Sequence, residues 1–406
     1  MLFELIENGS ITDVPGIRAA GVHAGLKKTG ALDMALILSE APAACAGVFT
    51  TNRFQAAPVL YDRDAIRSHP WGVRALVINS GCANACTGPE GEEDAREMAR
   101  LAGRAVGVDP NRVLVMSTGV IGQRLPMDKI AHGVALAALA LSAGGGHDAA
   151  RAIMTTDTRP KEVAVRTAVA GRQVTVAGMA KGAGMISPKM ATLLSAIFTD
   201  AAASPAALDA IIRQATEQSF NCITVDGDMS TNDTLLLLAN GLAGNPTISG
   251  PDDDGYRELL AAVTFVAIEL AKKIAFDGEG ATKHVTIEVK GGRTRGEAHQ
   301  AAMSIAKSPL VKTAIYGRDA NWGRVLCAVG YSGVPVDPNR VDMWLRDLHL
   351  VHQGRPYNVD EERAAAILAE EDVGITVDLG MGQESATVWT CDFSHDYVSI
   401  NAHYRT

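Results

Sequence analysis

The chain has 406 residues, of which 47% are hydrophobic and 20% are charged, and its formal net charge is −9. This composition is that of a globular protein with ample apolar surface for a core, and the acidic balance argues against general binding to nucleic acids or anionic membranes. We expect no membrane span, since no run of about 18 apolar residues occurs. The start of the sequence shows no signal-peptide pattern, and the six cysteines show no disulfide framework. We therefore expect a reduced, cytoplasmic protein.

Alanine-rich helical patterns alternate along the chain with strand patterns rich in valine and isoleucine. The clearest helix start is Ser204-Pro205, because serine is a good N-cap and proline is favoured at the first helical position. Several predicted strands follow one another directly, which favours a layered mixed α/β fold (α+β) over a regular βαβ repeat. In chain order, the predicted elements are strand Arg74–Asn79, helix Asp94–Val106, strand Arg112–Met116, helix Asp128–Ser142, strands Glu162–Ala168, Gln173–Ala177 and Leu193–Phe198, helix Pro205–Ser219, strand Thr234–Leu238, helix Tyr256–Ile274, strand Val285–Val289, helix Glu361–Glu371, and strands Gly374–Leu379 and Ala386–Asp392.

The segment GMISPKMATLLSAIFTDA, from Gly184 to Ala201, places Thr192 between a glycine-rich loop and an apolar strand. A threonine hydroxyl is a weak nucleophile without a base. Cleavage of the bond between Ala191 and Thr192 would supply one, because the new α-amine would adjoin the hydroxyl with a reference pKa of about 7.7–8.0. The same hydroxyl could make the cut by attacking the Ala191 carbonyl. From these residues alone, an ordinary strand threonine is the simpler interpretation.

Three glycine-rich segments contain polar residues that could line a site. In MSTGVIG, Thr118 and Gly119 could donate to a developing oxyanion, or they could form a plain turn after a strand. In AKGAGM, Lys181 could bind a carboxylate, although the segment lacks P-loop spacing and could be a simple glycine turn. In FDGEGATKH, Glu279 could bind a cationic group or could be an exposed loop acid.

Three other segments are less specific. DGDMSTND begins like an EF-hand, but it lacks the required glycine and glutamate, which leaves a magnesium site of another kind or a structural turn. In VINSGCANACTG, Cys82 or Cys86 could be a nucleophile, but neither has an evident partner. In the C-terminal SINAHYRT, Asn401 and Thr406 could return to a pocket or belong to a frayed end.

The joint order of these segments resembles the ornithine acetyltransferase family of arginine biosynthesis over nearly the whole chain. The motifs that carry the resemblance are NSGCANACTG, STGVIG, MTTDT, AKGAGMISPKMATLLSAIFTDA, SFNCITVDGDMSTNDT, DGEGATK, GRDANWGR and INAHYRT. The sequence departs from many members at Cys82 and Ser187, neither of which matches a functional position of the family.

The resemblance implies self-cleavage into an α chain of residues 1–191 and a β chain of residues 192–406, which assemble as an α2β2 heterotetramer. It implies ping-pong transfer of an acetyl group from N-acetylornithine to glutamate, with Thr192 as the nucleophile and Thr118 and Gly119 as the oxyanion hole. No metal or other cofactor is implied, although some members also use acetyl-CoA as a co-substrate. The substrate-binding positions implied by the resemblance are Thr155, Lys181, Thr192, Glu279, Asn401 and Thr406.

The family resemblance also implies a layered α/β sandwich that places the N-terminal threonine as in Ntn hydrolases, with a different topology. We expect the two cleaved chains to be inseparable without denaturant, because Thr192 would precede a central strand. The competing interpretations are a self-cleaving aminopeptidase-like hydrolase, in which water accepts the acyl group, a metal-dependent enzyme centred on Asp226, Asp228 and Asp233, and a non-catalytic binding protein.

Overall fold

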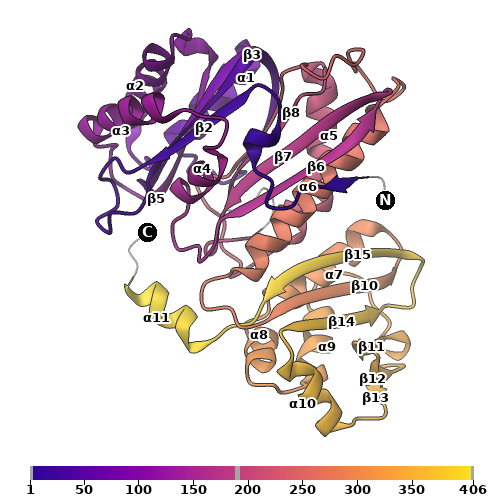
Figure 1. The fold of residues 1–406 in the computed structure, drawn as a ribbon. Helices are drawn as coiled ribbons and strands as arrows, with labels where there is room; N and C mark the ends of the chain where they lie inside the picture. Colours follow the sequence, from indigo (N-terminus) through magenta and orange to yellow (C-terminus); the bar gives the residue numbers. More distant parts are fainter. Residues whose placement is uncertain (1–2, 188–192, 404–406) are drawn as a thin grey trace.

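The computed structural model describes residues 3–187 and 193–403, which are organised around two β-sheets (Figure 1). The larger sheet has nine strands in the order β1-β6-β7-β8-β9-β3-β4-β5, with β2 paired to β3. Its strands are β1 Glu4–Leu5, β2 Ile17–Val22, β3 Met34–Phe49, β4 Trp71–Cys82, β5 Val113–Val120, β6 Lys161–Val169, β7 Arg172–Lys181, β8 Leu194–Thr199 and β9 Thr234–Ala239.

Strand β8 lies inside the larger sheet, antiparallel to β7 and parallel to β9. All six of its residues are buried, which explains why its sequence is a continuous apolar run without polar alternation. Ile197 packs in the core that faces α5 and α6, while Phe198 packs in the core on the other face. The strand that follows the predicted cleavage site is therefore a central element of the fold.

Helices cover both faces of this larger sheet. Helices α5 and α6 pack against each other on one face, and α4 packs with β2 on the other. The predicted start of α5 is confirmed, because the Ser204 side chain accepts a hydrogen bond from the Ala207 N–H and Pro205 opens the helix. The helices of this part are α1 Ala57–Ser68, α2 Gly88–Val106, α3 Met127–Ala140, α4 Gly146–Ala152, α5 Pro205–Gln218 and α6 Tyr256–Phe276, with 3-10 turns at Ile11–Asp13, Pro110–Arg112 and Phe220–Cys222.

The smaller sheet has six strands in the order β13-β12-β11-β14-β10-β15 and a separate core that includes residues of α7, α9 and α10. Its strands are β10 His284–Gly292, β11 Asp342–Leu345, β12 Leu348–His352, β13 Arg355–Pro356, β14 Asp372–Asp378 and β15 Glu384–Cys391. Its helices are α7 Arg295–Lys307, α8 Pro309–Tyr316, α9 Trp322–Gly330 and α10 Glu361–Ala369, with a 3-10 turn at Pro338–Arg340.

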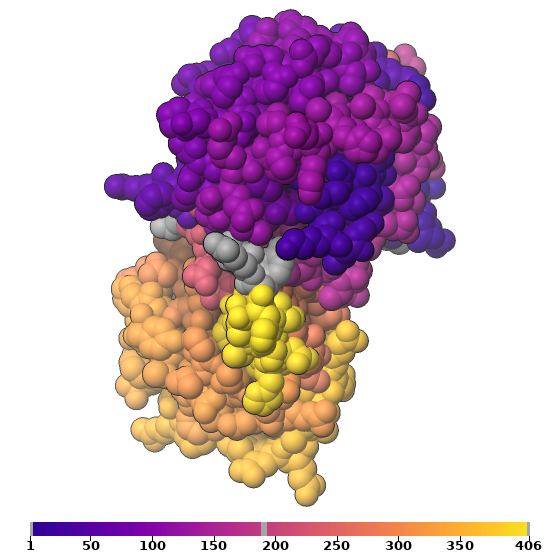
Figure 2. Space-filling view, turned by 90° about the vertical axis from the view of Figure 1, so that its left-hand side faces the viewer, coloured from indigo at the N-terminus to yellow at the C-terminus, as the bar shows by residue number. Residues whose placement is uncertain are grey.

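The last helix, α11 (His395–His403), returns from the smaller sheet towards the larger one. In the space-filling view of Figure 2, its yellow atoms lie at the junction between the two parts of the molecule. The C-terminal segment is helical up to His403, so the alternative interpretation of Asn401 as part of a frayed end is wrong. Thr406 lies outside the described residues.

The predicted mixed α/β layering is confirmed, and every predicted helix and strand is present with small differences in bounds. The division between the two sheets falls between α6 and β10, far downstream of residue 192. A cut between Ala191 and Thr192 would therefore divide the larger sheet and would not separate two folding units. No helix in the described ranges is both long enough and apolar enough to cross a membrane.

Candidate active site

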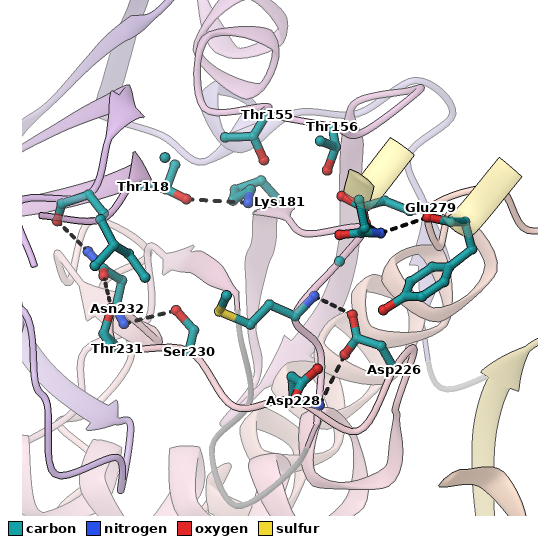
Figure 3. A pocket seen from close by; sticks show the side chains of 17 residues that line it. Thr118, Thr155, Thr156, Lys181, Asp226, Asp228, Ser230, Thr231, Asn232 and Glu279 are labelled. Carbon is teal, nitrogen blue, oxygen red and sulfur yellow. Dashed lines mark hydrogen bonds between the residues drawn. The ribbon is translucent and has the colours of Figure 1, made fainter. Parts of the chain in front are cut away.

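A cavity of about 350 Å³ lies where the ends of β5 and β7 meet the loop after α6 and helix α11. Residues from widely separated parts of the sequence line it, and Figure 3 shows their side chains converging. The cavity brings together Thr118, Gly119, Thr155, Lys181, Glu279 and Asn401 from among the predicted site residues. Ala191, Thr192 and Thr406, the other predicted site residues, lie outside the described part of the chain.

Thr118 and Gly119 stand at the end of β5 on the cavity wall. Gly119 has a φ of +130°, and a Cβ there would lie 2.3 Å from the carbonyl carbon of Gly81. Only glycine fits this position, because both the backbone conformation and the close approach of β4 exclude a side chain. The glycine therefore allows β4 and β5 to approach closely beside Thr118 at the strand end.

Lys181 is a buried cation next to Thr118. Its Nζ atom donates to Thr118 Oγ1 over 3.4 Å, as Figure 3 shows. Burial lowers the pKa of Lys181, and the charge of Asp157 opposes this effect. The lysine leaves the Thr118 hydroxyl hydrogen free to donate into the cavity, and it offers positive charge to an anionic group there.

Asp157, Lys161 and Asp277 form a buried ion cluster next to the end of β7 that carries Lys181. Lys161 is completely buried, and its Nζ lies 2.6 Å from Asp157 Oδ1 and 2.6 Å from Asp277 Oδ2. Burial alone would raise the pKa of Asp157, but the charges of Lys161 and Lys181 outweigh it and hold the pKa well below its usual range. The cluster therefore keeps a fixed negative charge near Lys181.

The same carboxylates hold the backbone of the cavity wall. Asp157 accepts hydrogen bonds from the N–H groups of Gly182 and Thr155, at 2.7 and 2.9 Å. Asp277 accepts from the N–H and the hydroxyl of Thr158. The cluster thus joins the Thr155 segment, the end of β7 and the loop that carries Glu279. Sequence analysis missed Asp157, Lys161 and Asp277.

Glu279 lies across the cavity from Thr118 in Figure 3. It is only 7% exposed, so the interpretation as an exposed loop acid is wrong. Asn401 of α11 donates to Glu279 Oε2 over 2.8 Å, while the Glu279 N–H donates to the Ala183 carbonyl. A Cβ on Gly184 would lie 2.3 Å from the same carboxylate oxygen. The glycine-rich AKGAGM loop therefore leaves room for the acid.

The DGDMSTND segment forms a hydrogen-bonded turn beside the cavity. Asp226 accepts from the N–H groups of Met185 and Ile186, at 2.5 and 2.9 Å, and from that of Asp228. Asp233 is 1% exposed and accepts from the Leu193 N–H at 2.9 Å. The structural-turn interpretation fits these contacts, because the carboxylates are bonded to backbone donors instead of facing a common centre.

The carboxyl group of Asp226 should make the stability of the folded protein depend on pH. Burial raises the pKa of Asp226 to about 6, although the backbone hydrogen bonds that the carboxylate accepts have the opposite effect. A carboxyl group that binds its proton more tightly in the folded state stabilises the protein fully below about pH 4, and that contribution is lost as the pH rises through 6. The wild type should therefore lose up to about 3 kcal/mol relative to Asp226→Asn between pH 4 and 7. Urea denaturation of both proteins across this range measures the difference, and parallel stability curves would contradict it.

Asn232 lines the cavity and was also missed by sequence analysis. Its side-chain amide donates to the carbonyl groups of Ala83 and Ser117, at 2.7 and 2.8 Å. Ser117 in turn donates to Asn79 Oδ1. These bonds fix the backbone immediately before Thr118 to the turn that follows Asp226. No local sequence signal distinguishes Asn232, because its partners are more than a hundred residues away.

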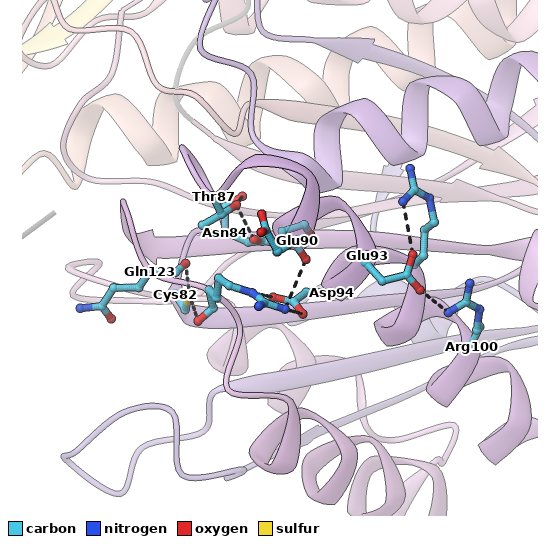
Figure 4. Close-up of polar contacts among 11 residues, drawn as sticks. Cys82, Asn84, Thr87, Glu90, Glu93, Asp94, Arg100 and Gln123 are labelled. Carbon is cyan, nitrogen blue, oxygen red and sulfur yellow. Dashed lines mark hydrogen bonds and ion pairs between the residues drawn. The ribbon is translucent and has the colours of Figure 1, made fainter.

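Cys82 is unsuited to the nucleophilic role considered from the sequence. The side chain is buried, and its Sγ contacts the Gln123 carbonyl at 3.3 Å, as Figure 4 shows. The neighbouring Arg124 forms an ion pair with Asp94. Burial raises the pKa of the Cys82 thiol. A buried thiol with a raised pKa is a structural group. Cys86 is exposed and does not line the cavity.

Comparison with known proteins agrees with the motifs that line the cavity. The model of the ArgJ family matches residues 18–406. The chain belongs to the ArgJ family. The arginine biosynthesis bifunctional protein ArgJ of Symbiobacterium thermophilum is 53% identical over 400 residues, covering 98% of this chain and 99% of the relative. The ArgJ protein of Geobacter sulfurreducens is 50% identical over 395 residues, covering 97% of this chain and all of the relative.

Solved structures of ArgJ proteins match parts of the chain. The crystal structure of the arginine biosynthesis bifunctional protein ArgJ from Bacillus halodurans is 44% identical, with a TM-score of 0.49, over 50% of this chain and 96% of that chain. The ornithine acetyltransferase of Mycobacterium tuberculosis, solved with ornithine, is 45% identical, with a TM-score of 0.43, over 46% of this chain and 98% of that chain.

Proposed function

We propose that the chain is a self-processing acetyltransferase of arginine biosynthesis that transfers the acetyl group of N-acetylornithine to glutamate. The observation that carries the proposal is the convergence of Thr118, Gly119, Lys181, Glu279 and Asn401 on one cavity. Membership in the ArgJ family, whose relatives are named arginine biosynthesis bifunctional proteins, supports the same function.

Thr192 is the nucleophile in this proposal. It is bonded to Leu193, whose N–H donates to the buried Asp233, and the next residue, Leu194, pairs with Lys181 between β8 and β7. One peptide unit thus separates the proposed nucleophile from backbone that is anchored beside the cavity. Self-cleavage after Ala191 frees the Thr192 α-amine, which accepts the hydroxyl proton as Oγ attacks the acetyl carbonyl.

The cavity offers groups for the charges of this reaction. Thr118 and the backbone at Gly119 stabilise the tetrahedral oxyanion. Lys181 binds the α-carboxylate of N-acetylornithine, and Glu279 binds its side-chain ammonium. Thr155, Asn401 and Thr406 complete the substrate site, as the family resemblance implies. No metal takes part, because the attacking group, its base and the oxyanion donors all come from the chain.

The reaction proceeds in two balanced halves. Collapse of the first tetrahedral intermediate breaks the amide bond, leaves the acetyl group as an ester on Thr192, and returns the proton to the departing ornithine amine. The amine of glutamate then attacks the ester, and its proton passes through the terminal amine to the Thr192 oxygen. The products are N-acetylglutamate and free enzyme.

Acetyl transfer is tested by incubating the purified protein with N-acetylornithine in the presence and absence of glutamate. A transferase should form N-acetylglutamate and release ornithine continuously only when glutamate is present. Equal ornithine release without glutamate would identify the related hydrolase, in which water accepts the acetyl group. Formation of N-acetylglutamate from acetyl-CoA and glutamate, measured in parallel, tests the second activity.

Replacing Thr118 by alanine should lower turnover by about 10²–10³-fold, because one oxyanion donor is lost. Thr118→Ser is the matched control, since it keeps the hydroxyl and its contact with Lys181. Steady-state kinetics should show a fall in kcat for the alanine variant and near wild-type values for the serine variant. A loss below about threefold in Thr118→Ala would remove this residue from the oxyanion hole.

The processed chains form an α2β2 heterotetramer in this proposal, and the enzyme works in the cytoplasm on small-molecule substrates. The α chain comprises residues 1–191 and the β chain residues 192–406. Sedimentation of the processed protein, combined with gel analysis of its two fragments, tests the assembly.

A further inference from the structure

A second group of chemically reactive side chains lies in the smaller sheet, on the β11–β12 hairpin. Asp342 begins β11, while His349 and His352 belong to β12. The hairpin lies near the β13 edge of the sheet, and none of the three residues lines the cavity of the proposed active site. Among the described residues, this is the place where three carboxylate, imidazole or thiol groups approach with the spacing of metal ligands.

A β-bulge brings the two histidines to one face of the sheet. In a regular strand, residues three apart point to opposite faces. The pairing of Met343 with Val351 shifts to Trp344 with His349, which leaves Leu350 as an extra residue in β12. The shift turns His349 to the face that carries Asp342 and His352, as bulges typically do. Local sequence does not predict this site, because the spacing H-x2-H puts two histidines on opposite faces of a regular strand.

The three ligand atoms have separations that suit a tetrahedral ion. Asp342 Oδ2 lies 3.6 Å from His349 Nε2 and 3.2 Å from His352 Nδ1, and all three ligand atoms lie within 4.8 Å of one another. Zinc binds nitrogen and oxygen ligands at about 2.0–2.2 Å in tetrahedral geometry, which places neighbouring ligand atoms about 3.3–3.5 Å apart. Two of the three edges of the site therefore lie within about 0.1 Å of this range.

The surroundings hold these ligands in place. The Gln353 N–H donates to Asp342 Oδ1 over 2.6 Å, which leaves Oδ2 turned towards the imidazoles. Trp344 stacks on the His349 ring at 4.5 Å between centroids, and Tyr357 covers the ring at 4.9 Å. Fixed orientation by a hydrogen bond to the second carboxylate oxygen is typical of metal ligands.

His349 Nε2 is the atom that most needs a partner. It is buried, and it makes no hydrogen bond to any other atom of the described residues. A buried imidazole nitrogen without a partner costs free energy, while a metal ion next to Asp342 Oδ2 would satisfy it. The other side of the site is open, because the His352 side chain is 47% exposed and leaves an ion access from solvent.

We propose that Asp342, His349 and His352 bind one divalent transition-metal ion of the zinc class, with water in the fourth position. Two imidazoles and one carboxylate favour zinc over calcium or magnesium, which prefer all-oxygen sites. The ion links the two strands of the hairpin at the end of the smaller sheet. The site is independent of acetyl transfer, so it stands whether or not the proposed function is correct.

The test is titration of the chelator-stripped, full-length protein with Zn²⁺ alone, followed by calorimetry. The wild type should bind one equivalent per chain, and His352→Ala should bind at least about tenfold more weakly. His132→Ala is the matched control, because it removes an exposed imidazole from α3 and should bind like the wild type. Equal binding by His352→Ala and the wild type, or no saturable binding, would overturn the proposal.

Cobalt provides an independent readout of the ligand set. Co²⁺ bound by two imidazoles and a carboxylate should give visible absorption of a tetrahedral ion without a thiolate charge-transfer band, and His349→Ala should abolish the absorption. A thiolate band would instead place the ion on the exposed Cys86 or Cys327 and would contradict the assignment. Circular dichroism of each variant confirms that it is folded.

Discussion

Replacing Thr192 by alanine should leave the chain uncut and lower acetyl transfer by at least about 10³-fold. The alanine variant lacks both the hydroxyl that attacks the Ala191 carbonyl and the group that carries the acetyl ester. The surrounding site should persist, because Leu193 and Leu194 keep their bonds to Asp233 and to β7.

Intact mass under denaturing conditions measures the first part of this expectation. The wild type should give two fragments that meet at Ala191–Thr192, and the variant a single full-length chain. Thr192→Ser is the control. This variant keeps a hydroxyl at the cleavage site and should still give two fragments. A single uncut chain in both the wild type and the alanine variant, with activity intact, would refute the terminal-amine mechanism.

Replacing Lys161 by methionine should lower the free energy of unfolding by about 3–5 kcal/mol. Among the described residues, Lys161 is the buried cation that contacts both Asp157 and Asp277. The side chain of Arg159 is exposed and approaches Asp277 at 3.8 Å. Methionine fills most of the same volume but leaves two buried carboxylates facing each other. The loss should therefore exceed what a change in packing would cause.

Lys312→Met is the matched control for this effect. Lys312 is also buried, but its Nζ donates to neutral partners, Thr390 Oγ1 and the Cys391 carbonyl. Its removal should cost less, about 1–3 kcal/mol. Neutralising the acids in Lys161→Met by Asp157→Asn and Asp277→Asn should recover part of the stability. A smaller loss in Lys161→Met than in Lys312→Met, measured by chemical denaturation, would contradict the role of charge.

The Lys161 variant should also lose turnover, because Asp157 accepts hydrogen bonds from the N–H groups of Gly182 and Thr155 at the cavity wall. Displacement of Asp157 would move Gly182, and with it Lys181, from the position beside Thr118. Steady-state kinetics at a temperature where the variant remains folded should show a lower kcat. The Lys312 variant should keep the wild-type value.

Local sequence patterns predicted the elements whose buried residues follow a simple pattern. Helix α6 has apolar residues at helical spacing, and β8 is a continuous apolar run because all six of its residues are buried. Strand β3 was missed because its sequence, MALILSEAPAACAGVF, includes Glu40, Pro42 and several alanines, which have low strand propensity. It forms because β2 and β4 pair with its first half and β9 with its second. Tertiary pairing overrides local preference in this strand.

Residues of the candidate cavity could be predicted where polar side chains stand in glycine-rich segments that also match motifs of a family. Thr118, Lys181 and Glu279 were found in this way, although nothing in their spacing indicates that they share a cavity. Lys161 could not be found, because its partner Asp277 is 116 residues away and Asp157, four residues away, is not on a helix with it. Ion pairs between residues that are distant in the sequence produce no local pattern from which they could be predicted.

The position of β8 and β9 in the larger sheet has a consequence for refolding. A chain cut before Thr192 contributes β8 and β9 from one fragment, and these strands lie between β7 and β3 of the other fragment. The uncut precursor can form this arrangement as a single molecule. After the cut, the same sheet can form only by association of two polypeptides, with the translational entropy that association costs. Processing would thus turn a unimolecular folding reaction into a concentration-dependent one, so that the mature enzyme depends for its structure on having folded before it was cut.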